Sequence, residues 1–241
     1  MSELNFLHSN GNKVKLTTPD TLAASKTFKL PGADGSSGQF LKTDGSGALS
    51  FATVSQPSPV NTGSLQVLEE FGSPCDGSSI TTSNGSVTFQ NVTGGQNNNF
   101  STYTDMTGSS ISYQPPSGTV QVHYYFSYVV GYLDNANGYQ LAHYQNVIDG
   151  NAVTKSKHTY RSNDYQGMQH IHWIYNIGGS TDYTVGRVAN WNSAKTLKVQ
   201  MREYSSSYNL KVHVNNYMDG GGPGDYLTLP TLYIKAIGVP S

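Results

Sequence analysis

Charged residues are scarce in this sequence of 241 residues. Asp, Glu, Lys and Arg together make up 12% of the chain, about half of the roughly 25% that is usual in soluble domains. The net charge is −1 at pH 7, so no basic field is available to neutralise phosphates. We therefore expect no nucleic-acid partner, and a surface that is mostly neutral and polar.

Cysteine is nearly absent, since Cys75 is the only one. A single cysteine excludes a framework of disulfides within the chain. Its neighbours Pro74 and Asp76 carry no cation that would stabilise a thiolate, so an inert thiol is expected.

Long apolar runs are also missing. The longest, residues 124–133, is interrupted by Ser127 and Gly131 and is too short to span a bilayer. The first residues lack the basic and apolar regions of a signal peptide. We expect no membrane insertion.

Strong helix formers are few, with only four Glu in the chain. Val, Ile, Thr and the 17 Tyr suit a pleated, half-buried surface instead. Residues 119–130 and 196–204 alternate between apolar and polar with period two, which indicates strands with one wet face. Further strands are predicted at 86–92, 139–149, 168–177, 210–217 and 226–237, the last broken at Pro230.

About eight strands separated by turn residues predict an all-β fold, a jelly-roll-like β-sandwich over residues 65–241. Before it, residues 55–64 form a linker in which two prolines favour extended conformations. Residues 1–54 form a small β-rich region of short apolar stretches, none long enough to build a core alone. In that region, Asp34-Gly35 and Asp44-Gly45 are predicted to be tight hairpin turns rather than calcium loops.

His170 and His172 are two residues apart in a predicted strand, so both imidazoles lie on one face, as in half of a metal site. No carboxylate follows until Asp182, and His213 would have to approach from another strand. Surface or interface histidines are the favoured interpretation. A metal shared by three chains on a threefold axis is the alternative.

Aromatic residues gather between positions 160 and 191, beside amide and hydroxyl side chains. Such a mixture suits sugar rings, whose apolar face stacks while the hydroxyls find hydrogen-bond partners. The alternative is that these rings fill the core or a subunit interface. The predicted glycan-binding set consists of Tyr160, Tyr165, Trp173, Tyr175 and Trp191.

Catalytic motifs are missing: there is no G-x-S-x-G elbow, no H-E-x-x-H and no phosphate-binding glycine loop. No spacing selects a pair of carboxylates for glycoside hydrolysis. We expect no enzymatic activity and no cofactor, and keep a β-sandwich enzyme acting on polysaccharide as an alternative.

Residues 30–51 carry Leu30-Pro31, Asp34-Gly35, Gly38-Gln39-Phe40-Leu41, Thr43-Asp44-Gly45 and Leu49-Ser50-Phe51. This segment resembles one in tail-fibre and other virion structural proteins of marine tailed phages, including cyanophages, and of algal viruses. Phe40 stands where an aliphatic residue is more usual. The rest of the chain is similar to a domain that accompanies the segment in those viruses.

The resemblance implies a virion location and a homotrimer attached to other virion proteins of the tail or capsid, and it supplies no catalytic residues. Trimerisation would let the apolar side chains of the first region share one core. The expected role is a fibre or spike whose head contacts a host-surface glycan, with a capsid decoration protein as the alternative. The predicted assembly residues are Phe28, Leu30, Phe40, Leu41, Leu49 and Phe51.

Overall fold

The computed structural model describes residues 3–17, 21, 23–25, 27, 29–53, 64–131, 140–162, 167–208, 210–215 and 226–240. The chain divides into two compact units, Met1–Val60 and Asn61–Ser241. The boundary falls inside the predicted linker 55–64, of which only Ser64 is among the described residues.

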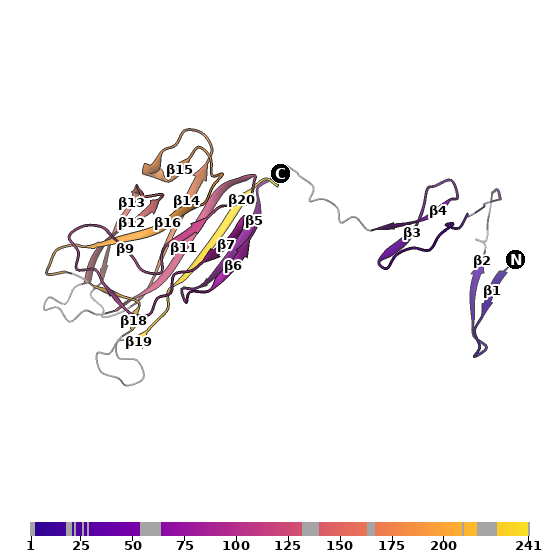
Figure 1. Ribbon diagram of the computed structural model, residues 1–241, viewed down its shortest axis with the longest axis horizontal. Coiled ribbons are helices and arrows are strands. Elements are labelled where there is room, and N and C mark those ends of the chain that lie inside the picture. Colours follow the sequence, from indigo (N-terminus) through magenta and orange to yellow (C-terminus); the bar gives the residue numbers. More distant parts are fainter. Residues whose placement is uncertain are drawn as a thin grey trace. The chain divides into compact units, whose positions relative to one another are not determined.

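The described residues of the first unit form two β-hairpins (Figure 1). Strands β1 (Glu3–Leu7) and β2 (Lys13–Thr17) form one, and β3 (Gln39–Thr43) and β4 (Leu49–Thr53) form the other. The Asp44 carboxylate accepts hydrogen bonds from the backbone N–H groups of Ser46 (2.8 Å) and Ala48 (3.0 Å). Gly45 supplies the positive φ (83°) that the turn between β3 and β4 requires. The prediction of a structural turn at Asp44-Gly45 is confirmed.

The prediction of a second hairpin turn at Asp34-Gly35 is wrong. These residues lie in the irregular segment that precedes β3, and the described residues between β2 and β3 form no strand. Gly35 is needed there for space, because a Cβ at this position would lie 2.6 Å from the Phe51 ring. The same dipeptide therefore serves two different purposes ten residues apart.

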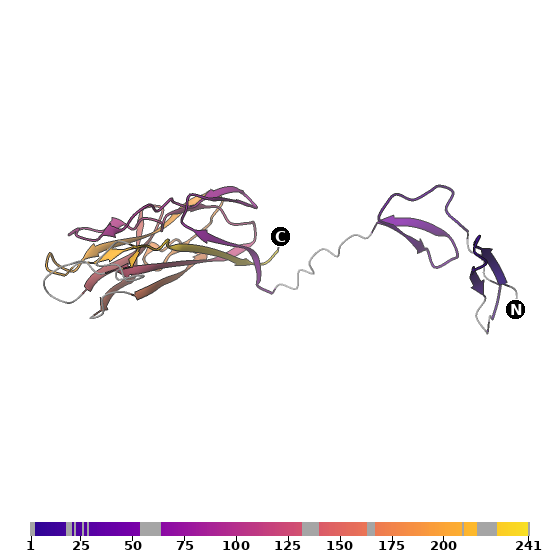
Figure 2. The same ribbon diagram turned by 90° about the horizontal axis from the view of Figure 1, so that it is seen from below.

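The second unit, called the head here, is built on two sheets that face each other and are antiparallel except for the short parallel pair of β14 and β15 (Figures 1 and 2). The five-stranded sheet contains β9 (Thr104–Asp105), β10 (Ile111–Tyr113), β12 (Gln140–Ile148), β13 (Asn151–Ser162) and β16 (Lys195–Glu203). The seven-stranded sheet contains β5 (Gln66–Pro74), β8 (Gln96–Asn97), β11 (Thr119–Gly131), β14 (Gly167–Ile177), β15 (Arg187–Val188), β17 (Lys211–Val212) and β20 (Thr231–Gly238).

Smaller elements decorate these sheets. Two hairpins pair β6 (Ser79–Thr82) with β7 (Gly85–Thr88), and β18 (Val214–Asn215) with β19 (Tyr226–Leu227). The only helical element in the described ranges is a 3-10 turn, Tyr183–Val185. Within those ranges, no helix has the length and apolar character needed to cross a membrane.

The eight main strands follow the order of a jelly roll. We number these eight strands in chain order, from β5 as 1 to β20 as 8. The five-stranded sheet then has the order 2-7-4-5 (β10-β16-β12-β13), and the seven-stranded sheet has the order 6-3-8-1 (β14-β11-β20-β5). This interleaving of two Greek keys confirms the all-β, sandwich-like fold expected from the alternating sequence pattern.

Strand alternation places the core between the sheets. On β11, Val122, Tyr124, Phe126 and Tyr128 are at most 1% exposed, as the sequence predicts. On β16, Leu197, Val199 and Met201 are fully buried and face them from the other sheet, also as predicted. The break at Pro230 separates β19 from β20.

Candidate ligand-binding pocket

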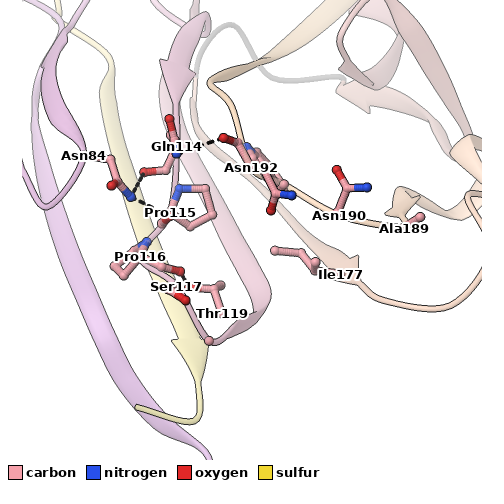
Figure 3. A pocket seen from close by; sticks show the side chains of 12 residues that line it. Asn84, Gln114, Pro115, Pro116, Ser117, Thr119, Ile177, Ala189, Asn190 and Asn192 are labelled. Carbon is pink, nitrogen blue, oxygen red and sulfur yellow. Dashed lines mark hydrogen bonds between the residues drawn. The ribbon is translucent and has the colours of Figure 1, made fainter. Parts of the chain in front are cut away.

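Two loops of the head enclose a pocket of about 310 Å³ at one end of the sandwich (Figure 3). One loop joins β10 to β11, and the other joins β15 to β16. Asn84 at the tip of the β6–β7 hairpin and Ile177 at the end of β14 complete the wall. The lining residues are Asn84, Gln114, Pro115, Pro116, Ser117, Gly118, Thr119, Ile177, Ala189, Asn190, Trp191 and Asn192.

Hydrogen bonds between side chains and backbone tie the walls together (Figure 3). The Asn84 amide donates to the carbonyl of Pro115 (2.8 Å), and the Gln114 amide donates to the carbonyl of Asn192 (3.1 Å). The pocket is thus held open by groups that are already paired, while the side chains of Asn190 and Asn192 are exposed at its rim.

Trp191 anchors the second loop to the core. Its indole N–H donates to the carbonyl of Tyr113 (2.9 Å), and its ring packs edge-on against Tyr175 at 6.3 Å. Only 4% of Trp191 is exposed. The indole therefore positions the neighbouring asparagines and does not offer a face for a ligand to stack on.

The chemistry of the pocket is neutral. Its polar groups are amides, hydroxyls and backbone carbonyls, and none of its lining residues is an acid, a base or a cysteine. Such a lining supplies hydrogen-bond donors and acceptors for an uncharged, hydroxyl-rich ligand. Its only hydroxyl side chains are Ser117 and Thr119, and none of its lining residues could activate them as a general base.

No family model matches the chain, and no curated protein matches it.

The predicted glycan-binding aromatics do not form one site. Tyr175 is fully buried in the core and Trp191 nearly so, which makes the prediction of a stacking role wrong for both. Tyr160 and Trp173 are half-buried and pack against the core. Tyr165 lies outside the described residues. The alternative interpretation, that these rings fill the core, holds for Tyr175 and Trp191.

Apart from Trp191, the residues that line the pocket were not predicted from the sequence. Asn84, Gln114, Asn190 and Asn192 lie in loops, where no alternation marks them. Their common signal is an amide next to proline, glycine or tryptophan, but Asn and Gln are frequent along the whole chain. Only the closure of the jelly roll brings these loops together.

Exposed aromatic faces occur in another part of the head. Tyr204 is 53% exposed and packs against Tyr208 at 6.1 Å and His143 at 5.6 Å. With Leu141 and Arg161, the two tyrosines line an open pocket of about 410 Å³. This tyrosine pocket offers ring faces, whereas the pocket of Figure 3 offers amides.

The two histidines of the predicted metal site, His170 and His172, contact different neighbours. Both lie on the outer face of β14, but His170 shares a hydrogen bond with Ser127 (Nδ1 to Oγ, 2.8 Å). His172 stacks on Tyr125 instead, at 4.0 Å and 4°. Across the part of the chain that the structure describes, no group of three or more His, Cys, Asp or Glu side chains could hold a metal ion. His213 is buried and does not join them.

The predicted assembly residues are largely solvent-exposed in the single chain. The exposed fractions are 77% for Leu30, 45% for Phe40, 50% for Leu41 and 40% for Phe51. Leu49 is half-buried, and Phe28 lies outside the described residues.

Proposed function

We propose that the protein is a virion structural protein, a homotrimeric fibre or spike that attaches through residues 1–54 and presents the jelly-roll head. The observation that carries this proposal is the exposure of large apolar side chains on the hairpin β3–β4 and just before it, at Leu30, Phe40, Leu41 and Phe51. Two-stranded hairpins are marginally stable in water without further packing. Their apolar side chains therefore favour association with other chains.

The free energy gained by burying these apolar side chains supports assembly. Burying a Leu or Phe side chain stabilises by about 1.5–3 kcal/mol, so several such side chains in each of three chains are sufficient to favour association. The resemblance of residues 30–51 to virion structural proteins supports sister chains and proteins of the tail or capsid as the proposed partners. Jelly rolls occur among viral capsid and lectin domains, although the fold alone assigns no function.

Light scattering of the full chain tests the assembly. We expect a mass three times the monomer's 26.0 kDa, and a shift to monomer when Phe40→Ser and Phe51→Ser are combined. The matched control is Leu65→Ser, because Leu65 is 58% exposed but lies in the head. A wild-type monomer at micromolar concentration would contradict the proposal.

Electron microscopy of virions decorated with an antibody to the head tests the location. We expect labelling of the tail. Labelling of the capsid surface would instead establish the alternative, a decoration protein whose N-terminal region binds neighbouring capsid subunits. The absence of label from the particle would overturn both.

We further propose that the head binds a neutral glycan in the pocket of Figure 3, because its lining is uncharged and rich in amides. In a glycan-binding screen, Asn190→Ala combined with Asn192→Ala should abolish the signal, while Tyr204→Ala in the tyrosine pocket should leave it unchanged. The reverse pattern would move the site to the tyrosine pocket. Release of free sugar from a bound polysaccharide would instead favour the enzyme alternative.

A further inference from the structure

A cluster of imidazole and phenol rings lies on the outer face of the seven-stranded sheet, away from the pocket of Figure 3. Tyr125 on β11 pairs directly with His172 on β14, and His123 is two residues before Tyr125 on the same face. Val122 and Tyr124 point into the core, so alternation turns His123 and Tyr125 outward. His172 is exposed, and His123 and Tyr125 are half-buried.

Two ring nitrogens of this cluster lie at a distance suited to a shared ligand. His172 Nε2 is 3.4 Å from His123 Nδ1, and the Tyr125 hydroxyl is 3.3 Å from the same Nδ1. Two zinc–nitrogen bonds of about 2.0–2.1 Å at a tetrahedral angle place their nitrogens about 3.4 Å apart. A direct N–H···N hydrogen bond would be expected nearer 3 Å.

Neighbouring rings hold His172 and Tyr125 in place. The Tyr125 ring stacks on His172 with the ring centroids 4.0 Å apart, and Tyr233 and Tyr125 pack edge to face with their centroids 5.6 Å apart. The Tyr233 hydroxyl in turn donates to a Glu70 carboxylate oxygen at 2.6 Å. These contacts orient His172 and Tyr125, and an outer layer that orients ligands strengthens metal binding.

We propose that His123 Nδ1 and His172 Nε2 bind a divalent transition-metal ion, with the Tyr125 oxygen as a neighbouring donor and water in the remaining positions. Imidazole nitrogens select Cu²⁺, Ni²⁺ and Zn²⁺, with Cu²⁺ bound most tightly. Mg²⁺ and Ca²⁺ require oxygen ligands and are excluded. The site differs from the predicted pair His170 and His172, since it joins two strands and leaves His170 with Ser127.

Calorimetric titration of the metal-free full chain with Cu²⁺, Zn²⁺ and Ca²⁺ tests the site. We expect binding of Cu²⁺ and weaker binding of Zn²⁺, with no heat from Ca²⁺. His123→Ala or His172→Ala should weaken Cu²⁺ binding by at least about tenfold, since each removes one of two protein ligands. The matched control is His170→Ala, an exposed histidine on the same face, which should change the affinity by less than about twofold.

A spectroscopic measurement distinguishes ligation from a structural effect of these substitutions. With Zn²⁺ bound, the ¹⁵N resonances should report coordination through Nδ1 of His123 and Nε2 of His172, and Tyr125→Phe should keep both signals because it retains the stacked ring. Equal weakening by His170→Ala would overturn the proposal. So would unchanged Cu²⁺ affinity in both His123→Ala and His172→Ala, which would make the pair a long hydrogen bond only.

Discussion

Among the described histidines, His213 has the least favourable combination of backbone conformation and side-chain burial. It lies between β17 and β18 with φ of 69°, in the left-handed region that side chains other than glycine rarely adopt. Its ring is fully buried against the rings of Phe126 and Tyr128, and neither nitrogen makes a hydrogen bond of good geometry. Burial lowers the pKa of this imidazole from 6.5 to about 4, although the backbone of Thr107 opposes part of the change.

The depressed pKa of His213 predicts a loss of stability in mild acid. Between pH 6.5 and about 4, the unfolded chain binds a proton that the folded head does not, so the free energy of unfolding falls as the pH falls. The full effect is about 3 kcal/mol. Since Asn tolerates a left-handed backbone and does not titrate, His213→Asn should remove this part of the pH dependence in urea unfolding curves.

The control for this measurement is His8→Gln, because His8 lies in the other unit and should not alter the unfolding of the head. The interpretation fails if the head of His213→Asn loses as much stability as the wild-type head between pH 7 and pH 4.5.

Cys75 should behave as an inert thiol. Burial raises its pKa to about 12, with a further contribution from the Asp76 carboxylate, and the thiol donates to the carbonyl of Gly108 (3.1 Å). We predict no reaction of the native chain with an aromatic disulfide reagent at pH 8. The same reagent should label one thiol per chain after unfolding. Rapid labelling of the native chain would show that the thiol is accessible.

At the scale of single elements, the end of β20 depends on a glycine. A Cβ at Gly238 would overlap the carbonyl oxygen of Gly118 and lie 2.7 Å from Cα of Thr119. These atoms belong to the backbone beside the pocket of Figure 3, so they are unable to move aside as a side chain would. The close approach also allows Val239 to donate to the Gly118 carbonyl at 3.0 Å.

Gly238→Ala should therefore destabilise the head by about 2 kcal/mol or more, a typical cost of overpacking. Gly94→Ala is the matched control, because a Cβ there meets open space and the φ angle is ordinary. Thermal unfolding of both variants, followed by near-ultraviolet circular dichroism, measures the difference. Equal melting temperatures for the two variants would contradict the packing argument.

Strands with one apolar face were predictable from the sequence, and strands without one were not. β11 and β16 alternate cleanly because their inner residues fill the core. β13 was missed because most of its described side chains are polar and only Val153 and Ser156 are buried. β5 was missed because Glu69 and Glu70 interrupt its pattern. Their carboxylates accept hydrogen bonds from the hydroxyls of Tyr113 and Tyr233.

The candidate site was less predictable than the fold. Aromatic clustering pointed to Trp191, but its ring is used for packing and the asparagines beside it reach the pocket. The pocket forms only when loops that are distant in the sequence come together in the fold. A local sequence pattern does not indicate which loops these are.

At the scale of the whole molecule, the two units differ in how far each can bury its apolar side chains. The head encloses a continuous core between its sheets, whereas the described apolar residues around β3–β4 remain exposed or half-buried. The head should fold without the first unit, and the first unit should need neighbours.

Truncation tests this difference. We predict that residues 64–241 form a folded monomer whose melting temperature equals that of the head transition in the full chain. Residues 1–60 alone should be unfolded or oligomeric by light scattering and circular dichroism. A folded monomer of residues 1–60 would show that its hairpins need no partner.

The pairing of β5 with β20 has a consequence for synthesis on the ribosome. In the described residues, β5 finds its main-sheet neighbour only in β20, although the two segments are separated by most of the head sequence. The nascent chain therefore holds β5 as an unpaired edge until nearly all of the head has emerged. Such non-local pairing slows folding and exposes strands to aggregation. Glu69 and Glu70, which made β5 hard to recognise, place two negative charges on that edge until β20 is synthesised. Charges of this kind discourage pairing with other nascent chains.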